Sequence, residues 1–434
     1  MLSGIGLLIA VALFIVMIVK GVDMVTSTVV TATIILITSG LDFWDGILNV
    51  FSAGAGGFCT SWFIILALGG IFGELVNITG LATKIAKSLA KALGPKRAGL
   101  IMMICTFFIT LLGINGYIMV FVLYPIADNL LRENKMDRRL LPFLMICGGA
   151  NANSFAFSMD ICNVIPANFL GTSLGVAPGL SVVFSVITCT WYVLYFNYAQ
   201  KKSMAKHSEQ ELLAMYKDIN VVMSDDELPG LFVSVLPFVL VLATVVATTG
   251  MGTNPSLASG LLTGVLVILI TQFGKVKSNL KATLKKGGMS GLNTMLTVAA
   301  VVGLSKVLTM APAFASVQQF VLNISLPMYF KTWLGTMICG ALTGSAITAE
   351  TLFLESFGQE FLAAGANINA LHRICAEAGI TMNKLPNASP VVMETDVCKC
   401  TLAESYKHVV FGSTIACVIA GFVITTMATM GLIF

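Results

Sequence analysis

Residues 371–397 read LHRICAEAGITMNKLPNASPVVMETDV, a largely apolar segment whose middle, Asn383–Pro390, is rich in residues that interrupt helices. Proline lacks the backbone N–H that a helix needs, and Asn and Ser bond to their own backbone instead. The pattern therefore predicts that one helix ends near Asn383 and another begins near Pro390.

The composition around this segment is that of a multi-pass membrane protein. Hydrophobic residues make up 57% of the 434 residues and charged residues only 11%, against roughly 25% in an average soluble protein. The mean hydropathy is +0.91. A span of about 20 residues leaves room for roughly ten to a dozen crossings in one membrane domain.

Eight long apolar runs are predicted to span the membrane completely. They lie near residues 2–19, 24–39, 58–77, 178–198, 230–248, 256–273, 288–308 and 408–431. The first has no basic start, so we interpret it as a span and not as a cleavable signal peptide.

Four further apolar stretches are interrupted at Gly113–Gly116, Asn151–Asp160, Gly340–Thr348 and Asn383–Pro390. Backbone freed from a helix cannot face lipid, because each unsatisfied N–H or C=O costs several kcal/mol. The interruptions must therefore lie inside protein or line a cavity, which makes them the candidate binding site.

A shift of 231 residues brings the first three spans onto those that start near residues 233, 255 and 289, and Gly113 onto Gly344. We therefore expect two repeats, joined by a solvated cytoplasmic linker. Residues 1–200 form the first, with an inner hairpin at about 98–131 and a broken helix at about 140–170. The linker is 201–227, and residues 228–434 form the second repeat, with an outer hairpin at about 328–362 and a broken helix at about 370–400.

The positive charges predict the orientation. With two re-entrant hairpins and two broken crossings, all but four of the 25 Lys and Arg residues fall on one side, which the positive-inside rule makes the cytoplasm. Both termini are then extracytoplasmic and the repeats are inverted. The exceptions are Lys306, Lys331 and Arg373, on or near the far side, and Lys384 inside the membrane.

Two short segments, residues 80–91 and 311–322, are predicted to be interfacial helices. Lys84, Lys87 and Lys91 are spaced for one helical face, which suits contact with membrane lipid headgroups.

The interruptions place small polar side chains at mid-membrane depth, where they can bind a carboxylate or hydroxyl group. Each interruption also starts a half-helix, whose N-terminal N–H groups favour an anion. The predicted substrate-binding residues are Asn115, Gly116, Asn151, Asn153, Ser154, Gly344, Ser345, Thr348, Asn383, Lys384, Asn387 and Ser389.

Three acids in apolar surroundings, Asp160, Glu350 and Glu377, are predicted to bind the coupling ion, because an ionisable group in a span is costly without a role. Lys384 needs an anion, either a substrate carboxylate or one of the protein's acids. Glu350 and Asp160 are the first candidates for that partner.

Three segments resemble the gluconate permease (GntP-type) family of proton symporters, within the wider ion transporter superfamily. They are SFAFSMDICNVIPANFLGTS (154–173), ALTGSAIT (341–348) and LHRICAEAGITMNKLPNASPVVMETDVCKCTLAESYKHV (371–409). The resemblance implies two inverted repeats, a scaffold with a mobile transport domain, elevator-type movement and a homodimer. Members carry gluconate and related sugar acids, and some carry D-serine or hydroxybutyrate. MDICN (159–163), Asn387 and Ala388 depart from the family pattern.

We therefore predict an all-α, ion-coupled symporter of a small organic carboxylate in a bacterial inner membrane, with proton or sodium left open. An amino-acid symporter is the alternative, because the additional acids permit an amine. A channel would need rings of equivalent polar residues from several subunits. An intramembrane enzyme would need Ser345 to contact His372, which is placed at the outer end of its helix. We expect no catalysis, cofactor, metal or nucleic-acid partner.

Overall fold

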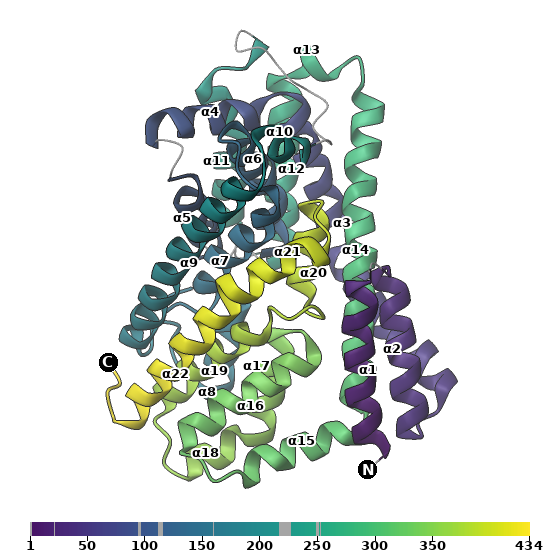
Figure 1. Cartoon of the computed structure of the whole chain (residues 1–434), viewed down its shortest axis with the longest axis vertical. Helices are drawn as coiled ribbons and strands as arrows, with labels where there is room; N and C mark the ends of the chain where they lie inside the picture. The colour runs from purple at the N-terminus through teal and green to yellow at the C-terminus, as the bar shows by residue number, and fades with distance from the viewer. Residues whose placement is uncertain are drawn as a thin grey trace.

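The computed structural model describes residues 2–20, 22–93, 97–111, 116–158, 160–216, 227–248, 251 and 253–434. Every long regular element in these residues is helical (Figure 1). The first half contains α1 (Leu2–Val19), α2 (Met24–Ser39), η1 (Asp45–Phe51), α3 (Ser52–Ile78), α4 (Leu81–Leu93), α5 (Ala98–Leu111), α6 (Gly116–Glu133), η3 (Arg138–Leu140), α7 (Leu141–Asn153), α8 (Ile161–Leu170) and α9 (Pro178–Lys206).

A short helix, α10 (Glu209–Ala214), follows, and the second half begins at residue 231. It contains α11 (Leu231–Ala247), α12 (Thr253–Thr271), α13 (Phe273–Val276), α14 (Leu280–Met310), α15 (Pro312–Asn323), α16 (Met328–Thr343), α17 (Ala346–Phe353), η6 (Leu354–Gly358), α18 (Gln359–Ala363), α19 (Ile368–Met382), α20 (Ser389–Val397), α21 (Leu402–Val409), η7 (Val410–Thr414) and α22 (Ile415–Thr429).

Five helices in the described residues are long and apolar enough to cross a membrane: Asp45–Ile78, Pro178–Lys206, Asn254–Thr271, Leu280–Met310 and Leu402–Thr429. The other three predicted spans form the apolar helices α1, α2 and α11, of 18, 16 and 17 residues. The all-helical membrane architecture expected from the composition is confirmed.

The central helix pair, α3 and α14, packs closely because glycines meet at the contact. A Cβ atom added at Gly291 would collide with the carbonyl of Leu66, and one at Gly70 with the carbonyl of Gly287. Gly287 and Gly291 are four residues apart and share one helix face, the small-residue spacing that lets membrane helices approach.

The other helices form two groups. In the first, α2 packs on α14 and α12 packs on α3, with α1 beside α2 and α11 beside α12. Figure 1 shows α1 and α2 along the lower part of α14 and α11 and α12 near the upper end. The second group pairs α5 with α7, α16 with α19, α8 with α19, α7 with α20 and α9 with α22. It contacts the central pair chiefly through α6 and α20.

Three of the predicted chain interruptions can be followed in the structure. Helices α7 and α8 are separated by residues 154–160, α16 and α17 by Gly344 and Ser345, and α19 and α20 by residues 383–388. The fourth is flanked by α5 and α6, and residues 112–115 between them lie outside the described residues.

The segment expected to be a solvated linker is partly helical and attached to the protein. Helix α9 continues to Lys206, and Ser208 with Glu211 forms a capping box at the start of α10. The Tyr216 hydroxyl donates to the carbonyl of Met136 at 2.8 Å. Residues 217–226 lie outside the described residues.

Just before α7, a buried ion pair fixes the same region. The guanidinium of Arg138 bonds to Asp128 Oδ1 at 3.0 Å and to the carbonyl of Met215 at 2.9 Å. The linker is therefore anchored beside α6 and α7.

The close contact between the glycines of α3 and α14 predicts that a larger side chain there destabilises the protein. Gly291→Ala should lower the free energy of unfolding by about 1 to 3 kcal/mol, because the new methyl group meets the backbone of Leu66. Gly288→Ala is the matched control, since a Cβ there meets only Ile71 at 3.8 Å. Thermal unfolding of both variants in the same detergent measures the difference. Equal stability of the two variants would contradict the packing account.

Candidate functional site

A small cavity of about 80 Å³ lies where the described chain interruptions meet. That volume is well below the roughly 300–1,000 Å³ of sites for drug-sized ligands, so it suits a compact solute. The wall consists of residues from α6, α7, α8, α17, α19 and α20 and from the interruptions between helices: Met119, Ile146, Gly149, Ala150, Asn153, Asp160, Ile161, Cys162, Gly344, Ser345, Ala346, Ile347, Ile380, Asn383, Lys384, Ser389, Pro390 and Glu394.

The turn between α16 and α17 is bonded to the interruption between α19 and α20. The N–H of Ser389 donates to the carbonyl of Gly344 at 3.2 Å, and Asn387 Nδ2 donates to the carbonyl of Ala341 at 3.0 Å. Gly344 has φ +64°, and a Cβ atom there would collide with the carbonyl of Asn387. Only glycine satisfies both the left-handed conformation and the contact.

Side-chain caps determine where two of the half-helices begin. Ser345 Oγ accepts the N–H of Thr348 at 3.2 Å and caps α17. Asp160 Oδ1 accepts the N–H of Cys162 at 3.0 Å and caps α8. Ala388, at the start of α20, has no side-chain cap. Instead, the N–H of Ser389 donates to the carbonyl of Gly344 and Pro390 has no N–H, so the N-terminal end of α20 beside the cavity needs no side-chain cap.

Arg373 on α19 holds the interruption between α7 and α8 in place. Its Nη1 atom donates to the carbonyl of Ser154 and to Asn163 Oδ1, and its Nη2 atom donates to the carbonyls of Leu174 and Val176 at 3.1 and 2.9 Å. Its side chain is completely buried in protein. The position of Arg373 on or near the far side of the membrane stays a prediction.

His372, next to Arg373, is also buried, and both ring nitrogens have partners. Nδ1 lies 2.6 Å from the Thr172 hydroxyl and Nε2 lies 3.0 Å from Asn163 Oδ1. An intramembrane enzyme would need Ser345 to contact His372, but Ser345 bonds to Thr348 instead. The two side chains therefore form no dyad.

Glu377 and Asn151 are buried anchors outside the cavity wall. Ser154 Oγ donates to Glu377 Oε2 at 2.5 Å and Ser181 Oγ donates to Oε1 at 3.3 Å. The Thr188 hydroxyl donates to Asn151 Oδ1 at 3.0 Å. Glu377 thus joins α19 to α9 and to the end of α7, and Asn151 joins α7 to α9.

Glu350 on α17 is, among the described acids, the one whose two carboxyl oxygens are both buried without a hydrogen-bond partner. Its side chain is completely buried, and neither carboxyl oxygen has a hydrogen-bond partner. It faces α19, where a Cβ atom added at Gly379 would collide with Oε1. A charged carboxylate without hydrogen bonds is expensive in such surroundings.

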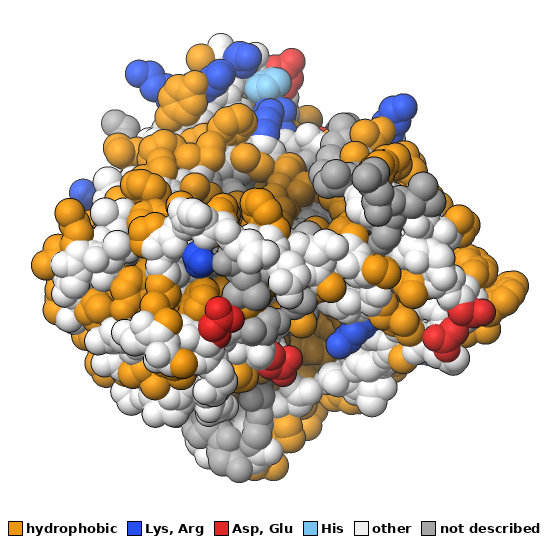
Figure 2. All heavy atoms as spheres, turned by 90° about the horizontal axis from the view of Figure 1, so that it is seen from below, with side chains coloured by type: hydrophobic (Ala, Val, Ile, Leu, Met, Phe, Trp, Pro, Cys, Tyr) orange, Lys and Arg blue, Asp and Glu red, His pale blue; other side chains and the backbone are white. Residues whose placement is uncertain are grey.

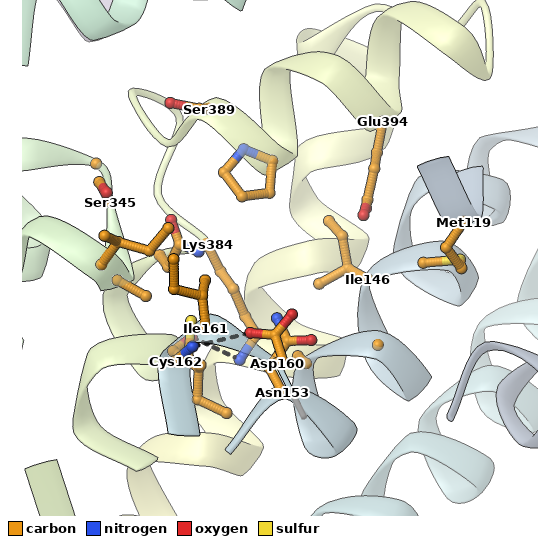
Figure 3. Close-up of a pocket in the computed structure, with 18 residues that line it drawn as sticks. Met119, Ile146, Asn153, Asp160, Ile161, Cys162, Ser345, Lys384, Ser389 and Glu394 are labelled. Atoms are coloured by element: carbon orange, nitrogen blue, oxygen red, sulfur yellow. Dashed lines mark hydrogen bonds between the residues drawn. The ribbon is translucent and has the colours of Figure 1, made fainter. Parts of the chain in front are cut away.

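Lys384 is 2% exposed, and its ammonium donates to the carbonyl of Ile380 at 2.9 Å and to Cys417 Sγ at 3.0 Å. No salt bridge joins it to a carboxylate in the described residues, so the expected pairing with Glu350 or Asp160 is wrong. Figure 3 shows Glu394 pointing from α20 toward the cavity, with Asp160 and Asn153 at the opposite end. Glu394 is 3% exposed and its Oε2 atom has no partner.

The structure thus divides the predicted site residues into two sets. The cavity wall contains Asn153, Asp160, Gly344, Ser345, Asn383, Lys384 and Ser389. Asn151, Ser154, Thr348, Asn387, Glu350 and Glu377 lie outside it as bonded or buried neighbours. Gly116 begins α6, and Asn115 lies outside the described residues. Whether any of them binds a ligand stays a prediction.

Sequence reasoning missed Glu394, the second acid of the cavity wall. The available signal was an acid in the segment SPVVMETDV (389–397), directly after an interruption. It also missed Cys162 and Pro390, which carry no such signal.

Comparisons with known proteins identify relatives that are described as a transporter and a permease. The chain is 24% identical over 405 residues to YxjC, an uncharacterized transporter of Bacillus subtilis, covering 83% of this chain and 85% of that one. It is 28% identical over 255 residues to an uncharacterized permease of Haemophilus influenzae, covering 54% and 49%.

A crystal structure of the YdaH transporter of Alcanivorax borkumensis aligns over 90% of both chains, with 11% identity and a TM-score of 0.40. The profile of the GntP family permeases matches residues 2–431, nearly the whole sequence. The chain therefore belongs to the GntP family of permeases.

Proposed function

We propose that the protein is a secondary active transporter that carries a small organic carboxylate, such as a sugar acid or hydroxy acid, by symport with an ion. The substrate binds in the cavity at the chain interruptions, and its carboxylate lies against Lys384. The family membership and the transporter relatives support the class of function. The identities of the substrate and of the coupling ion are inferred from the side chains of the site.

The unpaired ammonium of Lys384 carries this proposal. It is buried in the cavity wall, and its partners are a carbonyl and a thiol, not an anion. A cation inside the membrane is costly unless an anion neutralises it. The N-terminal end of α20 lies beside the same cavity, and the positive end of its helix dipole also favours negative charge. A carboxylate substrate supplies the anion that both features favour.

Proton coupling is supported by Glu350. Its buried carboxyl group has no hydrogen-bond donor to stabilise a negative charge, so loss of its proton requires a change in the surroundings. Asp160 and Glu377 are the charged groups that act on it. Substrate binding in the adjacent cavity can alter those surroundings. Sodium is the alternative ion, with Asp160 and the interruption carbonyls as oxygen ligands.

An inverted-repeat architecture is supported by matching helix contacts in the two halves. The pair α1–α2 corresponds to α11–α12, α5–α7 to α16–α19, and α6–α20 to α17–α8. The contact of α2 with α14 corresponds to that of α12 with α3. Each relation exchanges the halves, as a pseudo-twofold axis requires.

An elevator mechanism and a homodimer complete the proposal. The first helix group, around α3 and α14, serves as the scaffold and dimer contact, and the second carries the cavity. Both termini lie at the lower end in Figure 1, and the lysine-bearing α4 and α13 lie at the upper end. Figure 2 shows charged side chains of both signs scattered over the lower face among hydrophobic and uncharged polar ones. The position of the lysine-bearing helices at the opposite end supports extracytoplasmic termini in a bacterial inner membrane.

Lys384→Met tests the substrate site. The variant should fold, because the removed ammonium leaves only one carbonyl and one thiol unpaired, and gluconate affinity should fall at least about tenfold. Thermal-shift titration with gluconate and 3-hydroxybutyrate measures both quantities. Lys281→Met, at an exposed position on α14, is the control. Unchanged affinity in a stable Lys384→Met protein would rule out the substrate role.

Glu350→Gln tests proton coupling. The neutral side chain keeps the shape of the protonated acid, so exchange of substrate should continue while the proton gradient no longer drives accumulation. The accumulation ratio in proteoliposomes should fall to about one. Glu355→Gln, at an exposed position in η6, is the matched control. If Glu350→Gln, Glu377→Gln and Asp160→Asn all keep gradient-driven accumulation, the proton hypothesis fails and sodium is favoured.

A second candidate substrate is an amino acid, and Glu394 is the observation that favours it. The cavity wall holds two acids, Asp160 and Glu394, against one cation, and one oxygen of Glu394 has no partner. A zwitterion would place its carboxylate near Lys384 and its ammonium near Glu394.

Glu394→Gln distinguishes the two candidates. A substrate ammonium that bonds to Glu394 predicts a loss of roughly 10- to 150-fold in D-serine affinity, the value of a charged hydrogen bond, with gluconate affinity unchanged. Thermal-shift titration of wild type and variant with both ligands measures this. If wild type does not respond to D-serine, or the variant binds it equally well, the amino-acid candidate is wrong.

A further inference from the structure

A second cavity, unrelated to the substrate site, opens on the surface at the C-terminal end of α9. It has a volume of about 550 Å³ and lies between α9, α21 and η7. We call it the α9 groove. It is lined by Asp137, Arg139, Trp191, Tyr195, Tyr198, Ala199, Lys202, Ser203, Lys206, His207, Lys407, His408 and Phe411.

The exposed side chains of α9 change in character along its length. Val182 and Val186 are followed by Trp191 and Leu194, then by Tyr198, and finally by Lys202 and Lys206. At 1.5 Å per residue, about 24 Å separates Val186 from Lys202. Hydrocarbon, aromatic and cationic side chains in this order match a bilayer from its core through the interface to the headgroups.

The aromatic side chains of the α9 groove are fixed and yet exposed. Trp191 Nε1 donates to the carbonyl of Phe411 at 2.9 Å and so joins α9 to η7. Trp191, Tyr198 and Phe411 are 37%, 59% and 55% exposed. Together they form an apolar surface continuous with the lipid-facing side of α9.

The cationic end of the α9 groove has an excess of positive charge. Lys202, Lys206 and Lys407 are exposed and make no salt bridge in the described residues. Arg139 is paired with Asp137 at 2.7 Å. Burial raises the pKa of Asp137, but the hydrogen bonds from Arg139 and Ser203 outweigh it and the pKa lies below 3.8.

The remaining acids near the α9 groove are engaged elsewhere. Glu211 lies 3.8 Å from His207 and caps α10, and Glu404 caps α21 through Thr401. These caps leave the three lysines without an acid of their own.

One buried atom of the groove also lacks a partner. The Tyr195 hydroxyl lies 3.0 Å from His408 Nδ1, and Nε2 of the same ring is buried without a hydrogen bond. With Tyr195 donating to Nδ1, the neutral ring carries its proton on Nε2, which is a donor for an acceptor inside the groove.

We propose that the α9 groove binds an anionic phospholipid, with the phosphate near Lys202, Lys206 and Lys407 and an acyl chain along Trp191 and Phe411. A basic pocket between membrane helices at the headgroup level is the kind of site that holds such lipids. A soluble phosphate would use the lysines but not the aromatic surface that continues into the membrane. The proposal depends on the membrane location of α9 and not on the transported substrate.

The test uses the full-length protein, delipidated in a neutral detergent and titrated with dioleoylphosphatidylglycerol. The unfolding temperature should rise in a saturable way, and dioleoylphosphatidylcholine and glycerol phosphate should have little effect. Lys202→Gln/Lys206→Gln/Lys407→Gln should raise the half-maximal lipid concentration at least about tenfold, since each cation near an anionic headgroup contributes to binding.

The matched control is Lys277→Gln/Lys281→Gln/Lys285→Gln, which removes one cation between α13 and α14 and two from the first turns of α14. It should change the half-maximal concentration less than about twofold, because the α9 groove keeps its charge. The proposal is overturned if both triple variants lose the lipid response equally, if phosphatidylcholine stabilises as well, or if glycerol phosphate replaces the lipid. Unfolding temperatures without lipid verify that both variants are folded.

Discussion

Every backbone polar group inside a membrane must find a partner within the protein, and the arrangement around the cavity follows from this constraint. Three helices end and restart there, and backbone groups freed by the interruptions find partners within the protein. Ser389 donates to the carbonyl of Gly344, Asp160 caps α8 from the same segment, and Arg373 donates to the carbonyl of Ser154. The cavity is the small space that remains after these bonds are made.

The ionisable side chains around the cavity also differ in whether they have partners within the protein. Glu377 receives hydrogen bonds from two serines, so it serves to hold α7, α9 and α19 together. Glu350 receives none, and Lys384 meets no carboxylate. An ionisable group that already has partners stabilises the fold, whereas one without partners is a candidate for binding a substrate or an ion. This difference separates structural ionisable residues from candidate functional ones.

The helix interruptions could be predicted from the sequence because their cause is local. Gly344 and the segment around Pro386 and Pro390 disfavour a continuous helix before any tertiary contact is known. The roles of individual side chains were not predictable in this way. Asn383 and Asn387 are four residues apart in the same interruption, yet only Asn383 lines the cavity, because Asn387 bonds to Ala341 on another helix.

Arg373 and Glu394 show the limits of reasoning from charge alone. The positive-inside rule counts cations by position along the chain and gives no sign that Arg373 is buried against four hydrogen-bond acceptors from distant segments. Glu394 belongs to a helix whose face becomes known only when α20 packs against α7 and α14. Both depend on contacts between the two halves of the chain.

The bonds of Arg373 have a consequence for biosynthesis. The carbonyls of Ser154, Leu174 and Val176 are made early, in the first half of the chain, and their donor is about 200 residues away on α19. Until the ribosome has produced α19, the loop after α7 has no guanidinium to bond with. During synthesis these carbonyls must therefore bond to water or to the insertion machinery. The native loop forms only after the second half of the chain has been inserted.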